Sequence, residues 1–124
     1  MSGSAERILR SAGAISKKIR DVLHPSNGRR VVLVAFVGAD ALTLIGGKRA
    51  AKALDLYCWD DPNGTSPQGI RNLFRAGASI RFVSGLHMKL YWSQKAGYVL
   101  GSANLSRGAL GEAQAQSLLE LAVY

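Results

Sequence analysis

Two spacings of apolar residues alternate along the chain, one typical of helices and the other of buried strands. Near the start, apolar residues recur at intervals of three and four, which places them on one stripe of a helix: Ile8, Ala12, Ile15, Ile19 and Val22. Ser4 can cap this helix, and Pro25 and Gly28 can end it. We therefore predict an amphipathic helix from Ser4 to about His24.

Farther along, short apolar runs alternate with helical segments. Residues 30–37 form a continuous β-branched run between Arg30 and Gly38, which is typical of a strand buried on both faces. This alternation predicts an α/β fold with a mixed β-sheet flanked by helices. The other predicted elements are a helix from Ala39 to Ile45, a strand from Leu54 to Trp59, a helix from Gln68 to Ala76, a strand from Ser79 to Val83 and a last strand from Ser117 to Tyr124.

Length and charge limit the class of protein. A chain of 124 residues fits one compact domain, in which residues 1–29 form a basic helix and turn and residues 30–124 form the main domain. The formal net charge is +8, from sixteen Lys and Arg against eight Asp and Glu. Such an excess favours a polyanionic partner, nucleic acid before an anionic membrane, although a solubilising surface explains the same composition.

The polar face of the predicted N-terminal helix is basic and could lie along a phosphate backbone. A packed helix with a solvated basic face is the alternative interpretation. The residues that we assign to nucleic-acid binding are Arg7, Arg10, Lys17 and Lys18 on this helix, with Arg107 nearer the C-terminus.

The single cysteine and the short apolar runs indicate a compartment. Cys58 allows neither an internal disulfide nor a cysteine-based metal site, so a reducing compartment fits, and we predict the cytoplasm. The longest apolar run, Val31 to Val37, is too short to span a bilayer. The basic, acid-poor N-terminus leaves a mitochondrial presequence open, but the segment also works as an ordinary domain helix.

Two further groups of residues have plain structural explanations. Asp60 and Asp61 lie in a polar loop without a nearby histidine, so we interpret them as a solvated turn and expect no metal or cofactor. Four aromatic residues could stack on bases, but their place on predicted strands favours core packing for most of them: Trp59, Tyr91, Trp92 and Tyr98.

Chemically distinctive residues flank a predicted β-hairpin. Residues 90–92 and 98–100 have the pattern of short strands joined by a polar turn. Because the ends of paired strands meet, a nucleophile, a cation and hydrogen-bond donors can share one edge there. That combination suits the negative charge that develops when a phosphodiester reacts. The residues at the strand ends are His87, Lys89, Ser102 and Asn104.

These residues resemble the motif of the phospholipase D-like phosphodiesterases. That motif reads His-x-Lys, four residues, Asp, six residues, then Gly-Ser or Gly-Thr, any residue and Asn. Here the matching positions are His87, Lys89, Gly101, Ser102 and Asn104. The strong part of the resemblance covers residues 86–110, and a weaker part extends over most of residues 30–124, which would then be a phospholipase D-like catalytic half-domain.

The resemblance implies a role for each residue of the motif. His87 would attack phosphorus to form a phosphohistidine that water then hydrolyses, while Lys89 and Asn104 would bind the non-bridging oxygens. Ser102 would add a hydrogen bond, although a turn residue explains it almost as well. Glu120, on the last predicted strand, would orient His87 as acids do in catalytic triads, with an exposed strand edge as the alternative.

Gln94 stands where the family motif has Asp. That Asp is understood to support the fold around the motif, and position 94 lies in the predicted turn, where such side chains bind the local backbone. A glutamine still supplies an acceptor, so we expect activity to survive. The alternative is a decayed site that only binds.

The number of motif copies bears on assembly. Larger family members carry two copies, whereas this chain has one and no internal repeat. Phosphohistidine chemistry needs a second proton-transfer group, and His24, the only other histidine, is explained by its position at a helix end. We therefore predict a homodimer in which one His87 attacks and the other acts as the acid.

Together these inferences predict a metal-independent phosphodiesterase, specifically an endonuclease that cuts DNA, which we favour, or RNA. A phospholipid phosphodiesterase is one alternative, but the sequence shows no apolar acyl-binding surface and a membrane partner is not expected. A catalytically inactive nucleic-acid-binding module is the other.

Overall fold

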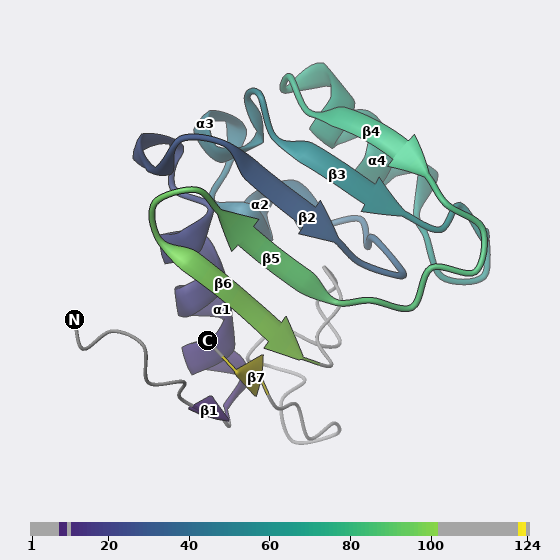
Figure 1. The fold of residues 1–124 in the computed structure, drawn as a ribbon. Helices are drawn as coiled ribbons and strands as arrows, with labels where there is room; N and C mark the ends of the chain where they lie inside the picture. Colours follow the sequence, from purple (N-terminus) through teal and green to yellow (C-terminus); the bar gives the residue numbers. More distant parts are fainter. Residues whose placement is uncertain (1–7, 10, 102–121, 124) are drawn as a thin grey trace.

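The computed structural model describes residues 8–9, 11–101 and 122–123, which form a single sheet with helices packed against it (Figure 1). The helical elements are α1 (Ala12–Val22), the short 3-10 helix η2 (Pro25–Asn27), α2 (Ala41–Ile45), α3 (Lys48–Ala51) and α4 (Pro67–Arg75). The strands are β1 (Ile8–Leu9), β2 (Arg30–Leu33), β3 (Asp55–Cys58), β4 (Ser79–Phe82), β5 (Leu90–Ser93), β6 (Gly97–Gly101) and β7 (Ala122–Val123).

The sheet is mixed, as the sequence predicts. Its seven strands lie in the order β1-β7-β6-β5-β2-β3-β4. Strands β2, β3 and β4 are parallel, and β5, β6, β7 and β1 continue from β2 in antiparallel pairs. Helices connect the parallel strands because a chain that continues in the same direction must cross back over the sheet. The predicted α/β fold with a mixed sheet is therefore confirmed.

One face of the sheet carries the core. Helices α1 to α4 lie behind the strands in Figure 1. Val32 of β2 and Leu56 of β3 are fully buried in one cluster with residues of all four helices, including Ile15, Ile45 and Leu73. Packing these apolar stripes against one sheet face buries the helices and holds the strand ends in fixed positions.

Strand β2 departs from the prediction for residues 30–37. Regular pairing stops at Leu33, and the residues on the outer face, Val31 and Leu33, are only half-buried. Val34 and Val37 are nevertheless fully buried, because the chain turns inward beyond the strand. The continuous apolar run therefore combines a strand covered on one face with a buried loop.

The N-terminal helix is shorter than predicted. Its cap is Ser11, whose hydroxyl accepts a hydrogen bond from the Ala14 backbone at 3.0 Å. Ile8 and Leu9 instead pair with Val123 and Ala122 as an extended segment. Ile8 fits the helical stripe in sequence but is 60% exposed. Local spacing could not reveal this, because the competing partner lies at the other end of the chain.

The elements predicted between residues 39 and 101 are present, with one addition. Helix α4 and strands β3 and β4 agree with their predictions to within about two residues, the usual uncertainty of element ends. Helix α2 ends at Gly46, whose φ of 116° suits glycine. The addition is α3, a single turn that begins after Gly47. Of the predicted last strand, residues 122–123 are described and form β7, and the others lie outside the described residues.

Arg30 joins three parts of the fold at the start of β2. Its guanidinium is buried and donates to the carbonyl oxygens of Leu23 at 2.9 Å and Lys52 at 2.6 Å, and also to those of Gly28 and Ala50. Burial lowers its pKa from the usual value. Carbonyl groups at helix ends are natural partners for a cation. Arg30 thereby fixes the ends of α1 and α3 beside β2, the strand that supports the hairpin.

Candidate functional site at the open end of the hairpin

The hairpin predicted from sequence is present and joins the segment after His87 to the strand that ends at Gly101. Leu90 pairs with Leu100, and the Gly101 backbone N–H donates to the carbonyl oxygen of Lys89 at 3.1 Å. Gly101, the first residue of the Gly-Ser-x-Asn segment, therefore lies beside Lys89. His87 is exposed and Lys89 is half-buried, so both are accessible at this end of the strand. The Lys89 ammonium donates to the His87 carbonyl oxygen at 3.4 Å.

An aromatic row supports the His87 ring. The ring of Trp59 meets His87 edge-on, with centroids 5.7 Å apart and an interplanar angle of 75°. Phe36 stacks on Trp59, with centroids 5.9 Å apart. Edge-to-face contacts of this kind favour one orientation of a ring over others. The Trp59 contact therefore limits the orientations of the His87 ring.

Hydrogen bonds hold Trp59 in place. Its backbone N–H donates to the Ala35 carbonyl at 2.9 Å, and its carbonyl accepts from the Thr65 hydroxyl at 2.6 Å. Gly64 lies against Phe36 so closely that an added Cβ would overlap the ring. The one sequence signal for Trp59 is its position directly after a parallel strand, at the sheet edge where α/β proteins bind ligands.

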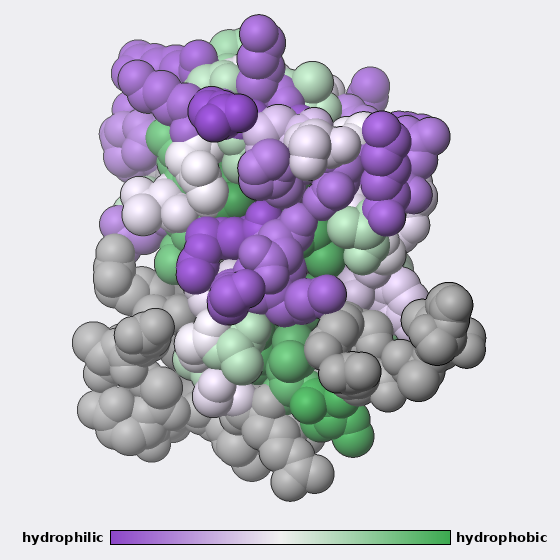
Figure 2. Space-filling view, turned by 90° about the vertical axis from the view of Figure 1, so that its left-hand side faces the viewer, coloured by the Kyte–Doolittle hydropathy of each residue, from purple (hydrophilic) through white to green (hydrophobic). Residues whose placement is uncertain are grey.

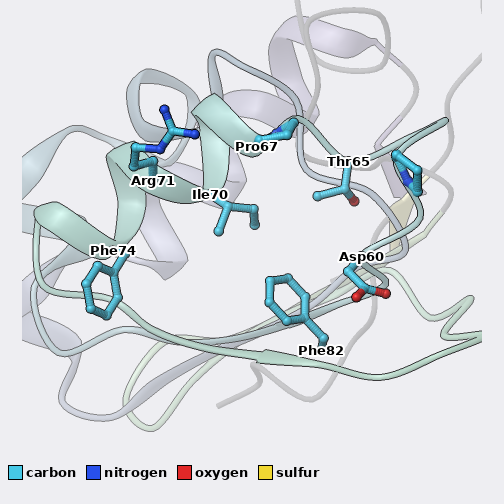
Figure 3. Close-up of a pocket in the computed structure, with 8 residues that line it drawn as sticks. Asp60, Thr65, Pro67, Ile70, Arg71, Phe74 and Phe82 are labelled. Atoms are coloured by element: carbon cyan, nitrogen blue, oxygen red, sulfur yellow. The ribbon is translucent and has the colours of Figure 1, made fainter.

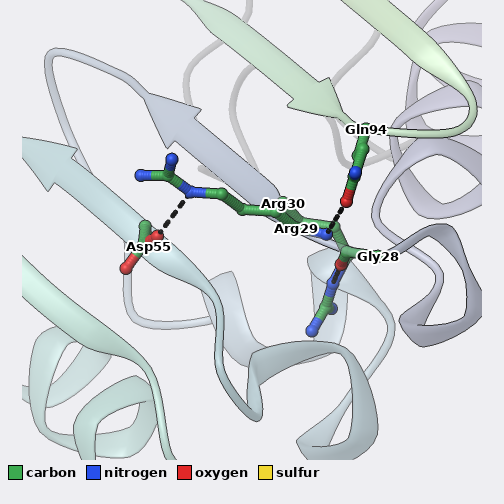
Figure 4. A network of polar contacts seen from close by, with 5 residues as sticks. All are labelled: Gly28, Arg29, Arg30, Asp55 and Gln94. Atoms are coloured by element: carbon green, nitrogen blue, oxygen red, sulfur yellow. Dashed lines mark hydrogen bonds and ion pairs between the residues drawn. The ribbon is translucent and has the colours of Figure 1, made fainter.

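Gln94 lies at the opposite end of β5 from His87 and binds the backbone. The side-chain oxygen of Gln94 accepts a hydrogen bond from the Arg29 backbone N–H at 3.3 Å (Figure 4). The backbone N–H of Gln94 donates to the Arg29 carbonyl oxygen at 2.8 Å. The Arg29 side chain pairs with Asp55 at 3.4 Å. A Cβ on Gly28, whose φ is 76°, would lie 2.7 Å from the Gln94 oxygen, so this contact also depends on glycine. Gln94 therefore links the β5–β6 turn to the backbone before β2, which agrees with the structural role expected for this position.

Cys58, directly before Trp59, is unsuited to nucleophilic chemistry. It is fully buried, and burial, helped by the nearby Asp60 carboxylate, raises the pKa of its thiol to about 11. Asp61 binds the Asn63 backbone N–H at 3.0 Å, as expected for a residue in a polar turn. The His87 imidazole, in contrast to this thiol, is exposed.

His24 and the cations of α1 lie away from His87. His24 caps η2, which adjoins the β5–β6 turn because the Lys95 N–H donates to the Asn27 carbonyl. Lys17 forms an ion pair with Asp21 at 2.9 Å, and Lys18 is half-buried. Helix α1 packs against β5 and β6. The predicted basic stripe is therefore partly neutralised where the structure describes it.

A larger group of cations, the basic surface, gathers at the end of the sheet opposite His87. Figure 2 views the side of the molecule with α1 and α3 and shows hydrophilic side chains across its upper and middle parts. All the members of this group are exposed, and helices α2, α3 and α4 contain no acidic residue. We define the basic surface as Arg20, Lys48, Arg49, Lys52 and Lys95.

Other residues assigned from sequence lie outside the described residues. This set comprises Ser102, Asn104 and Glu120 of the predicted catalytic group, with Arg7, Arg10 and Arg107 of the predicted nucleic-acid-binding group. Within the described ranges, no helix is long and apolar enough to cross a membrane.

The parallel β2–β3–β4 unit, continued by an antiparallel hairpin and covered by helices, is a phospholipase D-like fold. No protein-family model matches the chain, and no curated protein does. Among solved structures, it is similar to Nuc from Salmonella typhimurium, a phospholipase D family member. The TM-score is 0.68 and the identity 15%, over 96% of this chain and 82% of Nuc.

Two further structures share the fold. NucT from Helicobacter pylori matches with a TM-score of 0.65 and 11% identity, over 96% of this chain and 84% of NucT. The archaeal chromatin protein TrmBL2, whose structure shows a novel mode of DNA binding, matches with a TM-score of 0.54 and 9% identity. That match covers 95% of this chain but 44% of TrmBL2. At these identities the likeness is one of fold.

Proposed function

We propose that this protein is a phosphodiesterase of the phospholipase D type that cleaves nucleic acid, DNA in preference to RNA, without a metal ion. One observation carries the proposal: the hairpin joins Gly101 to Lys89, two residues after the exposed His87. This pairing supports a site with a nucleophile and a cation at the start of the Gly-Ser-x-Asn segment. The fold shared with a phospholipase D family member supports the same reaction class.

In the first step, an imidazole nitrogen of His87 forms a bond to phosphorus, and the bond from phosphorus to the leaving oxygen breaks. A general acid protonates that oxygen. Lys89 and Asn104 stabilise the charge on the non-bridging oxygens, and Ser102 adds a hydrogen bond. In the second step, water adds to phosphorus, the phosphorus–nitrogen bond breaks and a base takes the proton of the water.

The second proton-transfer group comes from a second copy of the chain. His24, the other histidine, lies at the far end of the sheet and is bound to Ser26. In a homodimer with its two-fold axis near His87, one imidazole attacks while its counterpart acts as the acid and then the base. Glu120 orients the imidazole, and Trp59 fixes its position through the edge-to-face contact.

The charge distribution supports nucleic acid as the substrate. The net charge of the chain is +8, and residues 62–101 contain five Lys and Arg and no acidic residue. We assign contacts with the phosphate backbone to the basic surface and to the residues predicted from sequence: Arg7, Arg10, Lys17, Lys18 and Arg107. A location in the cytoplasm stays a prediction.

A plasmid-nicking assay in EDTA tests this proposal. We expect the wild type and His24→Ala to nick DNA, because His24 is exposed and distant from the site. His87→Ala should lose activity by orders of magnitude. Full activity in His87→Ala, or strict dependence on added Mg²⁺, would contradict the mechanism.

The same preparations separate the alternatives. A wild type that binds DNA but never nicks it would be a nucleic-acid-binding module. A wild type that leaves DNA intact but floats with phospholipid vesicles and hydrolyses their headgroups would be a lipid phosphodiesterase.

A further inference from the structure

An open pocket lies between helix α4 and the edge strand β4 (Figure 3). Its volume is about 460 Å³, within the range of about 300–1,000 Å³ common for small-molecule sites. Ile70 and Phe74 of α4 face Phe82 of β4 across the opening, with Asp60 beside Phe82 (Figure 3). Arg71 completes the rim on the helix side.

The pocket adjoins the candidate site. Phe82 pairs with Cys58, whose neighbour Trp59 contacts the His87 ring. Asp60, which lines the pocket, follows Trp59 directly. Two of the residues that line the pocket are therefore neighbours, in the sheet or along the chain, of residues 58 and 59 beside His87.

The loop between Trp59 and α4 is held before any ligand binds. The Thr65 hydroxyl donates to the Trp59 carbonyl at 2.6 Å, and the Ser66 N–H donates to the Val37 carbonyl at 2.8 Å. The Ser66 side chain then caps α4 by accepting from Gly69. A wall fixed in this way loses little conformational entropy on binding.

The side chains favour a flat, polar-edged ligand. Phe74 is 68% exposed and Phe82 is 51% exposed, which is unusual for rings that flank one opening. Exposed aromatic faces stack on nucleobases. The Asp60 carboxylate can accept a hydrogen bond from a base amino group, and the Arg71 guanidinium can bind an adjoining phosphate.

An acyl chain fits these residues less well. Covering the pocket with hydrocarbon would take the Asp60 carboxylate out of water without supplying a hydrogen-bond donor, which is costly. The charges at both ends of the apolar wall also limit its length. A nucleobase with an attached phosphate can stack on the two rings, donate a hydrogen bond to Asp60 and bind Arg71.

We infer that this pocket binds one unpaired nucleobase next to the phosphate that His87 attacks, so that the favoured substrate is single-stranded nucleic acid. This inference rests on the proposed function for the location of the strand. Base pairing would hide the base from the pocket, because a paired base is stacked within its own duplex.

Binding to two labelled oligonucleotides, one normal and one with abasic residues throughout, tests the inference. We expect Phe74→Ala and Phe82→Ala each to weaken binding of the normal strand roughly tenfold and to leave the abasic strand unchanged. Phe74→Tyr should retain affinity, because it keeps the ring. Ile8→Ala is the matched control, since Ile8 is an exposed apolar residue outside the pocket.

Hydrolysis of bis(p-nitrophenyl) phosphate by the wild type tests the proposed reaction without a nucleobase. The pocket variants should cleave the abasic strand like the wild type, because that strand has no ring to stack on Phe74 or Phe82. If the wild type is inert on bis(p-nitrophenyl) phosphate, the proposed reaction fails, while base-dependent binding still reports on the pocket.

Three results would overturn the pocket assignment. The first is equal affinity of the wild type for normal and abasic strands. The second is loss of phosphatidylcholine vesicle binding in Phe74→Ala, which would indicate an acyl site. The third is dissociation of a dimer by Phe74→Ala or Phe82→Ala in sedimentation, which would make the pocket an interface between copies.

Discussion

Lys89 is the cation that the hairpin fixes beside His87, and its role is separable from the general positive charge of the chain. We predict that Lys89→Ala lowers kcat for a small phosphodiester by about 10²–10³-fold, because the ammonium stabilises charge that develops in the transition state. The matched control is Lys95→Ala, at the closed end of the same hairpin, where the side chain is exposed. Equal losses in both variants would assign the effect to net charge and contradict a local role for Lys89.

Gln94 stabilises the fold at the end of β5 opposite His87. We predict that Gln94→Leu, which loses the acceptor for the Arg29 N–H, lowers the free energy of unfolding by about 1 kcal/mol. Gln94→Asp keeps an acceptor and should hold activity within roughly tenfold of the wild type. Urea unfolding and nicking measured on the same samples check both values. An inert wild type that Gln94→Asp restores would show that the site had decayed.

Among single residues, the sequence identifies those that belong to a short local motif. His87 and Lys89 follow from a short spaced pattern, and in the structure Lys89 lies beside Gly101. Trp59 does not follow, because its role arises from contacts among residues 36, 59 and 87, which no local spacing connects. Arg30 marks the start of a strand in sequence, yet in the fold it ties together two helix ends.

Among the elements, the hairpin and α4 were predictable because their signals are local. Alternating apolar residues and Gly97 define the hairpin, and Ser66 and Pro67 give α4 a regular start. The start of α1 was not predictable, since Ile8 and Leu9 pair with a strand at the opposite end of the chain. Helix α3 has a single turn, too short for a periodic pattern to show.

The cations of α3 and α1 should contribute unequally to nucleic-acid binding. We predict that reversing Lys48 and Arg49 to Glu reduces the magnitude of the slope of log K against log salt more than reversing Lys17 and Lys18 does. The reason is that Lys17 already pairs with Asp21, whereas the α3 cations are exposed and form none of the ion pairs found among the described residues. Each lost phosphate contact removes about 0.9 of a unit from the slope on duplex DNA.

Oligonucleotide binding titrated over a range of salt concentrations measures these slopes, and melting curves confirm that each variant is folded. A larger effect from α1 than from α3 would contradict the assignment of the basic surface. An unchanged slope in both variants would show that these cations are solvated and make no contact with phosphate.

For the whole molecule, a single motif in each chain predicts that activity depends on assembly. Specific activity should fall on dilution below the dissociation constant of the homodimer. Mixing wild type with excess His87→Ala should form heterodimers with one imidazole instead of two, and activity should fall further than dilution of active chains alone. His24→Ala in the same excess is the control. A fully active monomer in sedimentation would contradict the dimer.

The fold class was within reach of sequence reasoning because alternating helices and strands permit few arrangements. The packing of the helices on one face of the sheet could not be predicted from the sequence. In the described residues all four helices lie on one face, while Val31 and Leu33 on the other face are half-buried. A run of β-branched residues looks alike in both situations, since burial depends on what the rest of the chain places over it.

In the proposed reaction His87 becomes covalently bonded to phosphorus. Rapid quenching of the reaction with a labelled oligonucleotide, followed by peptide mapping, detects this bond. We predict an acid-labile, base-stable adduct on the peptide that contains His87, present in the wild type and in His24→Ala and absent in His87→Ala. Continued cleavage by His87→Ala, or an adduct on any other residue, would contradict it.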